Sequence, residues 1–280
     1  MEEDQKYNRQ IMWFGVSGQA KIEQMRVAIV GAGGTGSHVA QQLAYLGVRD
    51  FLVIDADEVS KTNLNRLIGA NDQDVGKFKV NVAKRHIEYI SPTAKVLAIQ
   101  ESVISYSALN ALKLTDFIFG CVDSDGARLA LTEFTKAYEK PYLDIATEIF
   151  ENDWGGRIFF TDAKPGCLMC ANELTNSEIH KDLSTENERA GESKIYGVNK
   201  SKLAQKDPSV VSLNGILASL AVTEFIAGVT GIREIKRAMI YRGSRSHITF
   251  PSYVFPKDCF YCNGVLGIGD RSNMERYVRS

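Results

Sequence analysis

The chain has 280 residues, of which 24% are charged and 44% hydrophobic, and its formal net charge is −1. These proportions are ordinary for a globular protein with one large domain, and the near-neutral charge argues against a general nucleic-acid binder, which needs a basic excess. With 6 prolines and 5 cysteines, the chain is neither a low-complexity sequence nor a disulfide scaffold.

The hydropathy of the chain predicts no membrane span, because no run of about 18 apolar residues occurs. Residues 1–4 are acidic where a secretory signal would be basic and then apolar. We therefore expect a cytoplasmic protein whose thiols stay reduced. A single domain over 1–280 is predicted, with a helical arm at 1–25, a first half at 26–150 and a second half at 151–280.

Short apolar runs alternate with helix-like stretches in the first half. Each run suits a buried strand, and the amphipathic stretches end at signals such as Gly47 and Ser91-Pro92. The expected strands cover 27–30, 51–54, 96–99, 117–119 and 142–145, and the expected helices cover 35–46, 78–90 and 126–138. This alternation predicts a parallel sheet covered by helices on both faces.

The pattern changes in the second half. A strand is expected at 155–161, and two more near 238–241 and 247–250. Residues 172–206 are polar, charged and aperiodic, so we interpret them as a long, mobile crossing loop. The mostly apolar stretch at 210–229 predicts a helix buried in a core or in a subunit interface.

A glycine-rich turn follows the first expected strand, where residues 31–36 fit the pattern G-x-G-x-x-G. Gly31, Gly33, Gly34 and Gly36 allow the backbone to approach a phosphate, and the N-terminus of the next helix supplies N–H donors. Asp55 ends the next strand, about 20 residues on, where a ribose-binding acid is expected. The turn by itself does not distinguish NAD from ATP, and a dehydrogenase would share it.

Later residues suit a triphosphate better than a dinucleotide. A nucleotide that loses its outer two phosphates needs Arg and Lys at the phosphate oxygens and an acid for Mg²⁺. Asn63, Arg66, Lys79 and Asp123 offer that set, and Lys79 fits the register better than Lys77. Taken singly, each charged residue could also be a solvated surface residue or a helix cap. The prediction therefore rests on the set of residues together.

In order and spacing, these motifs resemble those of the ThiF/MoeB/HesA family, the adenylation module of ubiquitin-activating enzymes. The resemblance covers essentially the whole chain and implies a Rossmann-like, doubly wound, mostly parallel sheet with a mixed or antiparallel C-terminal extension. The matching pieces are Tyr7-Asn8-Arg9-Gln10, the glycine turn, Asp55-x-Asp57, Asn63-Leu64-Asn65-Arg66, Gly76-x-x-Lys79, Cys121-x-Asp123 and two Cys-x-x-Cys pairs.

The resemblance implies an adenylyltransferase that uses ATP and Mg²⁺. It activates the C-terminal carboxylate of a ubiquitin-like or sulfur-carrier protein, or of a peptide, and releases pyrophosphate. A homodimer is expected, in which Arg9 reaches the active site of the other subunit like an arginine finger in trans. The residues implied in nucleotide binding are the four glycines, Asp55, Asp57, Asn63, Arg66, Lys79 and Asp123, with Asp123 also holding Mg²⁺, and those implied in catalysis are Arg9, Arg66, Lys79 and Asp123.

Two Cys-x-x-Cys pairs stand far apart in the chain, Cys167 with Cys170 and Cys259 with Cys262. Four thiolates suit a tetrahedral Zn²⁺, and the resemblance also implies structural zinc here. Two redox pairs, or incidental thiols, are the alternatives. Cys121 is expected to be a core residue, and the absence of cysteine between the two pairs predicts that no thioester forms on this chain.

Two other functions stay open. An NAD-dependent oxidoreductase explains the glycine turn and Asp55 but leaves Arg66, Lys79 and the paired cysteines without roles. A non-catalytic relative that only binds a ubiquitin-like partner explains the fold, but it does not explain why the residues suited to a triphosphate are all present.

Overall fold

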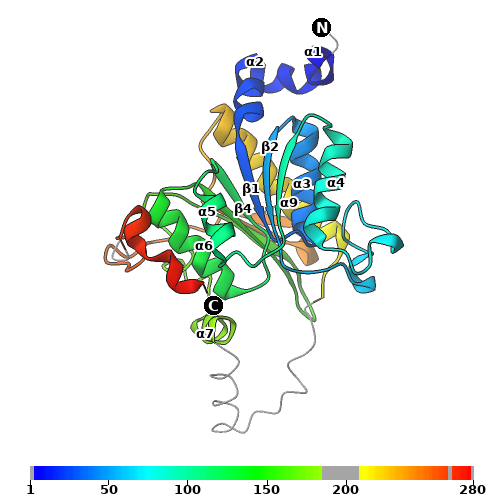
Figure 1. The fold of residues 1–280 in the computed structure, drawn as a ribbon. Helices are drawn as coiled ribbons and strands as arrows, with labels where there is room; N and C mark the ends of the chain where they lie inside the picture. Colours follow the sequence, from blue (N-terminus) through cyan, green and yellow to red (C-terminus); the bar gives the residue numbers. More distant parts are fainter. Residues whose placement is uncertain (1–2, 185–207, 264–266, 279–280) are drawn as a thin grey trace.

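The structure, a computed structural model, describes residues 3–184, 208–263 and 267–278. One eight-stranded sheet forms its centre, in the order β3-β2-β1-β4-β5-β6-β7-β8 (Figure 1). Strands β1 to β5 run parallel and the later three pair antiparallel, which confirms the expected fold class. The strands are β1 (Arg26–Val30), β2 (Asp50–Ile54), β3 (Lys95–Ile99), β4 (Phe117–Gly120), β5 (Tyr142–Ile149), β6 (Trp154–Thr161), β7 (Ala238–Arg242) and β8 (His247–Thr249).

Helices cover both faces of this sheet. α3, α4 and α9 pack on one face, whereas α5 and α6 pack on the other (Figure 1). The helices are α1 (Glu3–Lys6), α2 (Asn8–Gln24), α3 (Gly34–Leu46), α4 (Lys79–Ile90), α5 (Tyr106–Leu112), α6 (Asp125–Tyr138), α7 (Asn176–Leu183) and α9 (Val211–Thr230).

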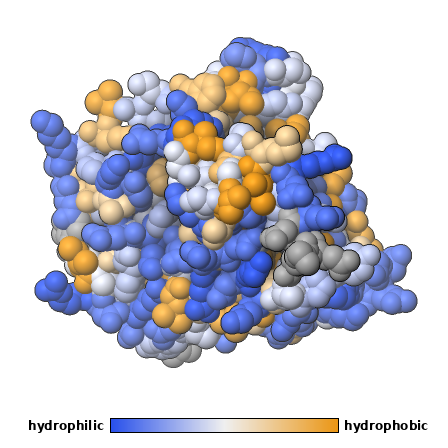
Figure 2. Space-filling model, turned by 90° about the horizontal axis from the view of Figure 1, so that it is seen from above, coloured by the Kyte–Doolittle hydropathy of each residue, from blue (hydrophilic) through white to orange (hydrophobic). Residues whose placement is uncertain are grey.

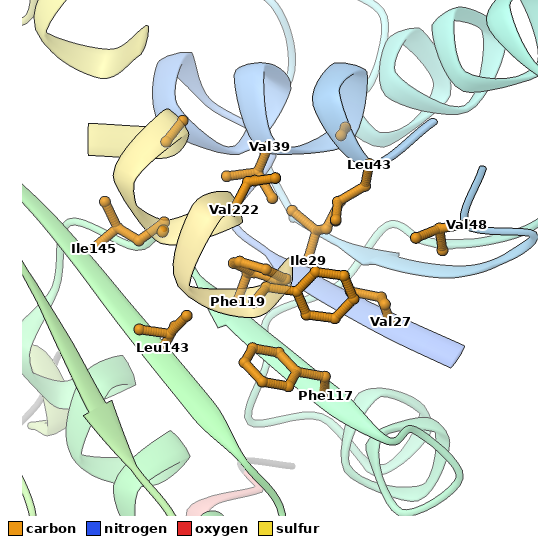
Figure 3. Close-up of a cluster of buried hydrophobic side chains, with 14 of the residues drawn as sticks. Val27, Ile29, Val39, Leu43, Val48, Phe117, Phe119, Leu143, Ile145 and Val222 are labelled. Atoms are coloured by element: carbon orange, nitrogen blue, oxygen red, sulfur yellow. The ribbon is translucent and has the colours of Figure 1, made fainter. Parts of the chain in front are cut away.

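The strands form because their side chains alternate between two cores. Val27 and Ile29 of β1 face one core, and the intervening Ala28 faces the other. Figure 3 shows the first core, where Ile29 and Phe119 lie beneath Val222 of α9. Because β1 is buried on both faces, its run is continuously apolar, which is typical of a parallel strand.

Helix α9 is a core element and not an exposed apolar interface. Leu217 and Phe225 are fully buried, whereas Ser212, Ser219 and Thr223 face solvent. Its length and hydropathy would also suit a membrane span, but it packs against α3, α2, β5 and β6. Of the two predicted locations, a core or a subunit interface, the fold therefore supports the core, which accounts for the apolar composition of the helix.

Two short helices, α5 and α7, were not predicted from the sequence. The prediction of an aperiodic loop over 172–206 is wrong in its first part, because residues 176–183 form α7. Ile179 is the buried residue of this helix. The rest of that loop, 185–207, lies outside the described residues. α5 begins where the Ser105 hydroxyl accepts a hydrogen bond from the Ala108 amide at 3.2 Å.

Candidate functional site

The glycine turn lies at the carboxyl edge of β1, between the ends of β2 and β4. The Gly31 amide donates to the Ile54 carbonyl at 2.8 Å, and a Cβ at Gly31 would lie 2.5 Å from the Cys121 carbonyl oxygen. A Cβ at Gly36 would lie 1.9 Å from the Gly31 oxygen. At Gly33, by contrast, no atom lies within 4 Å of an added Cβ. Of the four glycines in the turn, Gly31, Gly34 and Gly36 are needed for packing, and Gly33 faces open space.

Asp55 holds the turn in this shape. Its carboxylate accepts hydrogen bonds from the Ala32 amide at 2.7 Å and from the Asp57 amide at 2.8 Å. Burial raises the pKa of Asp55, and the charge of Lys79 and the two amides oppose that rise. Each oxygen keeps a second lone pair, so the carboxylate can still accept from a ribose hydroxyl.

Lys79, at the start of α4, turns toward Asp55 and Asp57. Its ammonium donates to Asp57 Oδ2 at 2.6 Å, and the residue is only 8% exposed. The rival Lys77 has a side chain 54% exposed and pairs with Asp74 at 3.2 Å. The register thus brings Lys79 to the glycine turn and leaves Lys77 at the surface. Asp57 is therefore the carboxylate that pairs with Lys79 within the chain.

Asn63 and Arg66 come from a short segment that crosses in front of the turn. Asn63 ends a 3₁₀ helix (Lys61–Asn63) and is buried, with its side-chain oxygen accepting from the Ser60 amide at 3.0 Å. The Arg66 guanidinium donates to the Thr62 carbonyl. A Cβ at Gly34 would lie 3.5 Å from Arg66 Cδ, so this arginine lies beside the glycine turn.

Two polar residues not singled out from the sequence complete this packing. The Ser37 hydroxyl donates to the Gly34 carbonyl at 2.8 Å and accepts from the Ile68 amide at 3.0 Å, which ties the Arg66 segment to α3. Asn214, 1% exposed, lies so close that its amide nitrogen would be 2.2 Å from a Cβ at Gly34. An amide within a mostly apolar helix is the sequence signal that could have identified it, because a buried amide requires partners.

Asp123 follows β4 at the same edge of the sheet. The Cys121 amide donates to the Val30 carbonyl at 2.7 Å, which extends the pairing of β1 and β4 toward Asp123. The N-cap of α6 is Ser124, whose hydroxyl accepts from the Ala127 amide at 3.1 Å, so the exposed Asp123 is not the cap. Cys121 is half-buried and packs against the first core, which supports its prediction as a core residue, and burial raises the pKa of its thiol.

A buried ionic network lies behind Asp123. Asp144 is fully buried and accepts from Arg157 at 2.5 Å and from the Tyr142 hydroxyl at 2.7 Å. Arg128 lies 3.3 Å from the same carboxylate and donates to the Val122 carbonyl at 2.8 Å. The network therefore fixes the backbone next to Asp123. A charge inside an apolar strand was the available signal, because a buried carboxylate requires a partner.

Helix α7 is fastened to the start of α6, close to Asp123. The Gly126 amide donates to Asp182 at 3.0 Å, and the Thr175 amide donates to Asp125 at 3.0 Å. A Cβ at Gly126 would lie 2.8 Å from Asp182 Cβ, so the close approach depends on this glycine. Figure 1 shows α7 below α6, at the carboxyl side of the parallel strands.

Among the residues predicted for the nucleotide site, Arg9 is the one that the described structure does not bring to this edge. Its neighbour Gln10 donates to the Leu46 carbonyl at 2.9 Å, at the C-terminus of α3. α3 has 13 residues and begins at the glycine turn, so Arg9 lies about 20 Å from that turn. Figure 2 shows the molecule from the side of this arm, with apolar side chains scattered over the face. The arm itself exposes Met12, Trp13 and Val16.

The four paired cysteines meet in one cluster. Sγ–Sγ distances are 3.6 Å for Cys167 and Cys170, 3.8 Å for Cys167 and Cys259, and 3.8 Å for Cys170 and Cys262. All four sulfur atoms lie within 4.8 Å of one another. Zn–S bonds of about 2.3 Å place tetrahedral sulfurs about 3.8 Å apart, so the cluster fits Zn²⁺. Such an ion would tie the segment after β6 to the C-terminal segment.

Comparison with known families agrees with this arrangement. The model of the ThiF family matches residues 7–257, which is most of the chain. The chain belongs to the ThiF family. The match spans both the nucleotide edge and the first Cys-x-x-Cys pair, so the family likeness is not confined to the glycine turn.

Several relatives of this ThiF-family chain are named adenylyltransferases. The adenylyltransferase and sulfurtransferase uba4 of Aspergillus niger is 32% identical over 144 residues, 51% of this chain and 30% of that protein. Ubiquitin-like modifier-activating enzyme 5 of Aedes aegypti is 32% identical, over 58% of this chain and 44% of its own. A probable molybdopterin-synthase adenylyltransferase of Porphyra purpurea is 24% identical, over 90% and 61%. The chain thus spans less than two thirds of these relatives.

Solved structures share the fold of the ThiF-family chain. Escherichia coli MccB, solved with AMPCPP and MccA, superposes with a TM-score of 0.74 at 20% identity, over 92% of this chain and 73% of MccB. PaaA superposes with a TM-score of 0.69 at 21% identity, over 91% and 74%. At this identity the likeness is one of architecture.

Proposed function

We propose that this chain adenylates the C-terminal carboxylate of a ubiquitin-like or sulfur-carrier protein, or of a peptide, using ATP and Mg²⁺. One observation carries the proposal: Arg66 beside Gly34, Lys79 on Asp57 and Asp123 after β4 come from three separate segments and lie at the edge of the sheet that carries the glycine turn. The printed names of the relatives, which include adenylyltransferases and a ubiquitin-like modifier-activating enzyme, support it.

The nucleotide would lie along the carboxyl edge of β1, β2 and β4. Backbone amides of the glycine turn and the N-terminus of α3 suit the phosphates, and Asp55 suits the ribose. Arg66, Lys79 and the Asn63 amide suit the outer phosphates, with Asp57 keeping the lysine in place at 2.6 Å. Asp123, exposed after β4, would hold Mg²⁺ together with phosphate oxygens.

The reaction requires positioning and charge stabilisation more than proton transfer. An oxygen of the substrate carboxylate attacks the α-phosphorus, and its new bond forms as the bond to the bridging oxygen breaks. Pyrophosphate leaves with that electron pair. The carboxylate is already ionised at neutral pH, so the step needs no general base. Cationic side chains aimed at the departing phosphates stabilise the developing charge.

We propose that the active protein is a homodimer in which Arg9 serves the partner subunit. In its own subunit Arg9 lies about one length of α3 from the glycine turn, too far to reach a nucleotide there. An exposed arginine on a projecting arm is suited to contacting the nucleotide site of a neighbouring copy. We place the protein in the cytoplasm, where ATP and reduced thiols coexist.

Isotope exchange between pyrophosphate and ATP tests this proposal. The probes are peptides ending in glycine with a free carboxylate, the same peptides with a C-terminal amide, and a small ubiquitin-like protein. Exchange should require Mg²⁺ and a free carboxylate. Arg66→Ala and Asp123→Ala should each lower the exchange rate by at least about 100-fold, the usual scale for a charge that stabilises a transition state.

Arg49→Ala is the matched control, because Arg49 is exposed at the opposite edge of the sheet and pairs with Glu23. It should exchange at the wild-type rate. Tight binding of NADH with no binding of ATP would overturn the proposal. Wild-type exchange in the Arg66→Ala protein would overturn the site assignment alone.

A further inference from the structure

The cysteine cluster has a buried cation beside it. Two lysines are buried among the described residues, Lys79 at 8% exposed and Lys136 at 9%. Lys79 faces the Asp57 carboxylate, whereas the Lys136 ammonium donates to two backbone carbonyls, those of Asp162 at 2.6 Å and Lys164 at 2.5 Å. A buried ammonium is costly unless negative charge lies near.

The two carbonyls belong to the loop that leads from β6 into Cys167. The same loop directs backbone amides at sulfur: the Gly166 amide donates to Cys262 Sγ at 3.3 Å, and the Cys167 amide donates to Cys170 Sγ at 3.1 Å. Arg237 holds the loop from the other side by donating to the Gly166 carbonyl at 3.2 Å. Lys136 thus acts on the loop that shapes the cluster.

The zinc–thiolate centre would carry excess negative charge, which the positive charge of Lys136 can offset. Zn²⁺ with four thiolates carries a net charge of −2, and Cys167 and Cys259 are buried at 0% and 8% exposed. Arg237 is already paired with the Asp162 carboxylate at 3.8 Å. Burial lowers the pKa of Lys136, and the negative charge of Cys262 and Cys167 is the main influence that opposes this. The geometric link between the ammonium and the cluster is the pair of hydrogen bonds to the loop that carries Cys167.

We propose that Lys136 is a positioning residue of the zinc site, whose positive charge offsets the zinc–thiolate centre and whose hydrogen bonds hold the loop that carries Cys167. The charge stabilises the thiolates as a set, so zinc binds more tightly than at an uncompensated centre. The role is independent of the adenylation proposed above, because it concerns metal affinity and not the nucleotide.

Zinc affinity of the full chain, measured by competition with a chromogenic chelator at fixed pH, tests the proposal. Lys136→Met keeps the aliphatic stem and removes charge and donors, whereas Lys136→Gln keeps an N–H donor without charge. Both should weaken zinc binding, by roughly the 10- to 100-fold seen when partners behind metal ligands are removed. Lys136→Arg should restore most of the affinity. Lys84→Met, at a surface pair with Glu88, is the control and should change nothing.

A second readout separates charge from simple loss of structure. In the cobalt(II)-substituted protein, removing a nearby cation raises the energy of the sulfur lone pairs. The sulfur-to-cobalt charge-transfer band of Lys136→Gln should therefore move to longer wavelength, and that of Lys136→Arg should not. Wild-type zinc affinity and an unmoved band in the Gln variant would overturn the proposal, as would a wild-type protein that binds no zinc.

Discussion

At the scale of single residues, the glycine turn separates packing from ligand contact. A Cβ at Gly36 meets the backbone oxygen of Gly31 at 1.9 Å, whereas a Cβ at Gly33 meets nothing within 4 Å. Gly33 also has an ordinary φ of −79° that alanine adopts without strain. Fold and ligand binding thus depend on different glycines of one motif.

Gly33→Ala should therefore leave stability within about 0.5 kcal/mol of wild type, as for a substitution without structural contacts. It should weaken ATP binding at least about tenfold, because the added methyl occupies the space in front of the turn. Gly36→Ala, the matched variant, should lose both stability and ATP binding. Thermal unfolding and calorimetric titration with ATP measure the two effects. Equal ATP affinity in Gly33→Ala and wild type would show that the nucleotide does not approach this face.

Asp74 illustrates a charge that serves the fold alone. Its buried carboxylate accepts from Arg85 at 2.6 and 2.7 Å and from Lys77 at 3.2 Å. The hydrogen bonds from Arg85 are the main cause that holds the pKa of Asp74 well below its usual 3.8. Because the pKa of Asp74 is lower in the folded state, its ionised carboxylate stabilises the protein at pH values above the unfolded-state pKa. This contribution is lost as the pH falls from the unfolded-state pKa through the folded-state pKa.

Asp74→Asn should lower the free energy of unfolding at pH 7 by roughly 1 to 3 kcal/mol, the range for hydrogen bonds to charged groups. It should also flatten the decline in stability between about pH 4 and pH 2, because the titrating group is gone. Urea denaturation at several pH values measures both. Asp72→Asn, exposed on the same 3₁₀ helix (Asp72–Asp74), should follow the wild-type curve. An unflattened decline in Asp74→Asn would contradict the assignment.

At the scale of elements, amphipathic patterning explains which helices and strands were predictable. The predicted strands β1, β2 and β4 are apolar runs, because helices cover both faces of the sheet there. α7 has only two apolar side chains directed at the core, Ile179 and Leu183, and so short a pattern did not distinguish it from a loop. Its position depends instead on long-range hydrogen bonds to the start of α6, which no local pattern encodes.

Asp182→Ala should loosen α7 and the first turn of α6, because the carboxylate accepts from the Gly126 amide at 3.0 Å. Losing a helix-capping acceptor costs about 1 kcal/mol, so hydrogen-exchange protection of the Gly126 amide should fall about fivefold. The Mg²⁺ concentration needed for half-maximal exchange of pyrophosphate should rise, since Asp123 adjoins that turn. Glu178→Ala, at an exposed pair with Lys181 on the same helix, is the control. Unchanged protection in Asp182→Ala would refute the coupling.

At the scale of the whole molecule, the distribution of the site residues bears on assembly. Five predicted residues gather at the carboxyl edge of the sheet: Asp55, Asn63, Arg66, Lys79 and Asp123. Arg9 stands on the arm beside the C-terminus of α3, at the opposite end. A site that contains all six residues, as we propose, would therefore take Arg9 from a second copy of the chain.

Mixing Arg9→Ala with Asp123→Ala subunits should restore activity that neither variant has alone. In a mixed dimer one site keeps Asp123 and receives an intact Arg9, and the other site lacks both. Random exchange of subunits then leaves about a quarter of all sites complete. Pyrophosphate exchange by the mixture, with subunit exchange followed by native mass spectrometry, measures this. Mixed dimers without activity would rule out a role for Arg9 in trans.

The sequence by itself determined the parts that depend on neighbours along the chain. The glycine turn and Asp55 follow from a strand–turn–helix unit, and each Cys-x-x-Cys pair is local, so spacing was enough to predict them. Lys79 was distinguished from Lys77 by helical register. Local spacing is informative here because local backbone geometry sets where such side chains point.

Only the tertiary structure decided which distant residues meet. Asn214 against Gly34, Arg157 against Asp144, and Lys136 beside the cysteines each join segments far apart in the chain. Their pairing depends on how helices pack on the sheet, and buried polar groups find partners only once that packing excludes water. The same packing made α9 a core helix, which its composition alone left undecided.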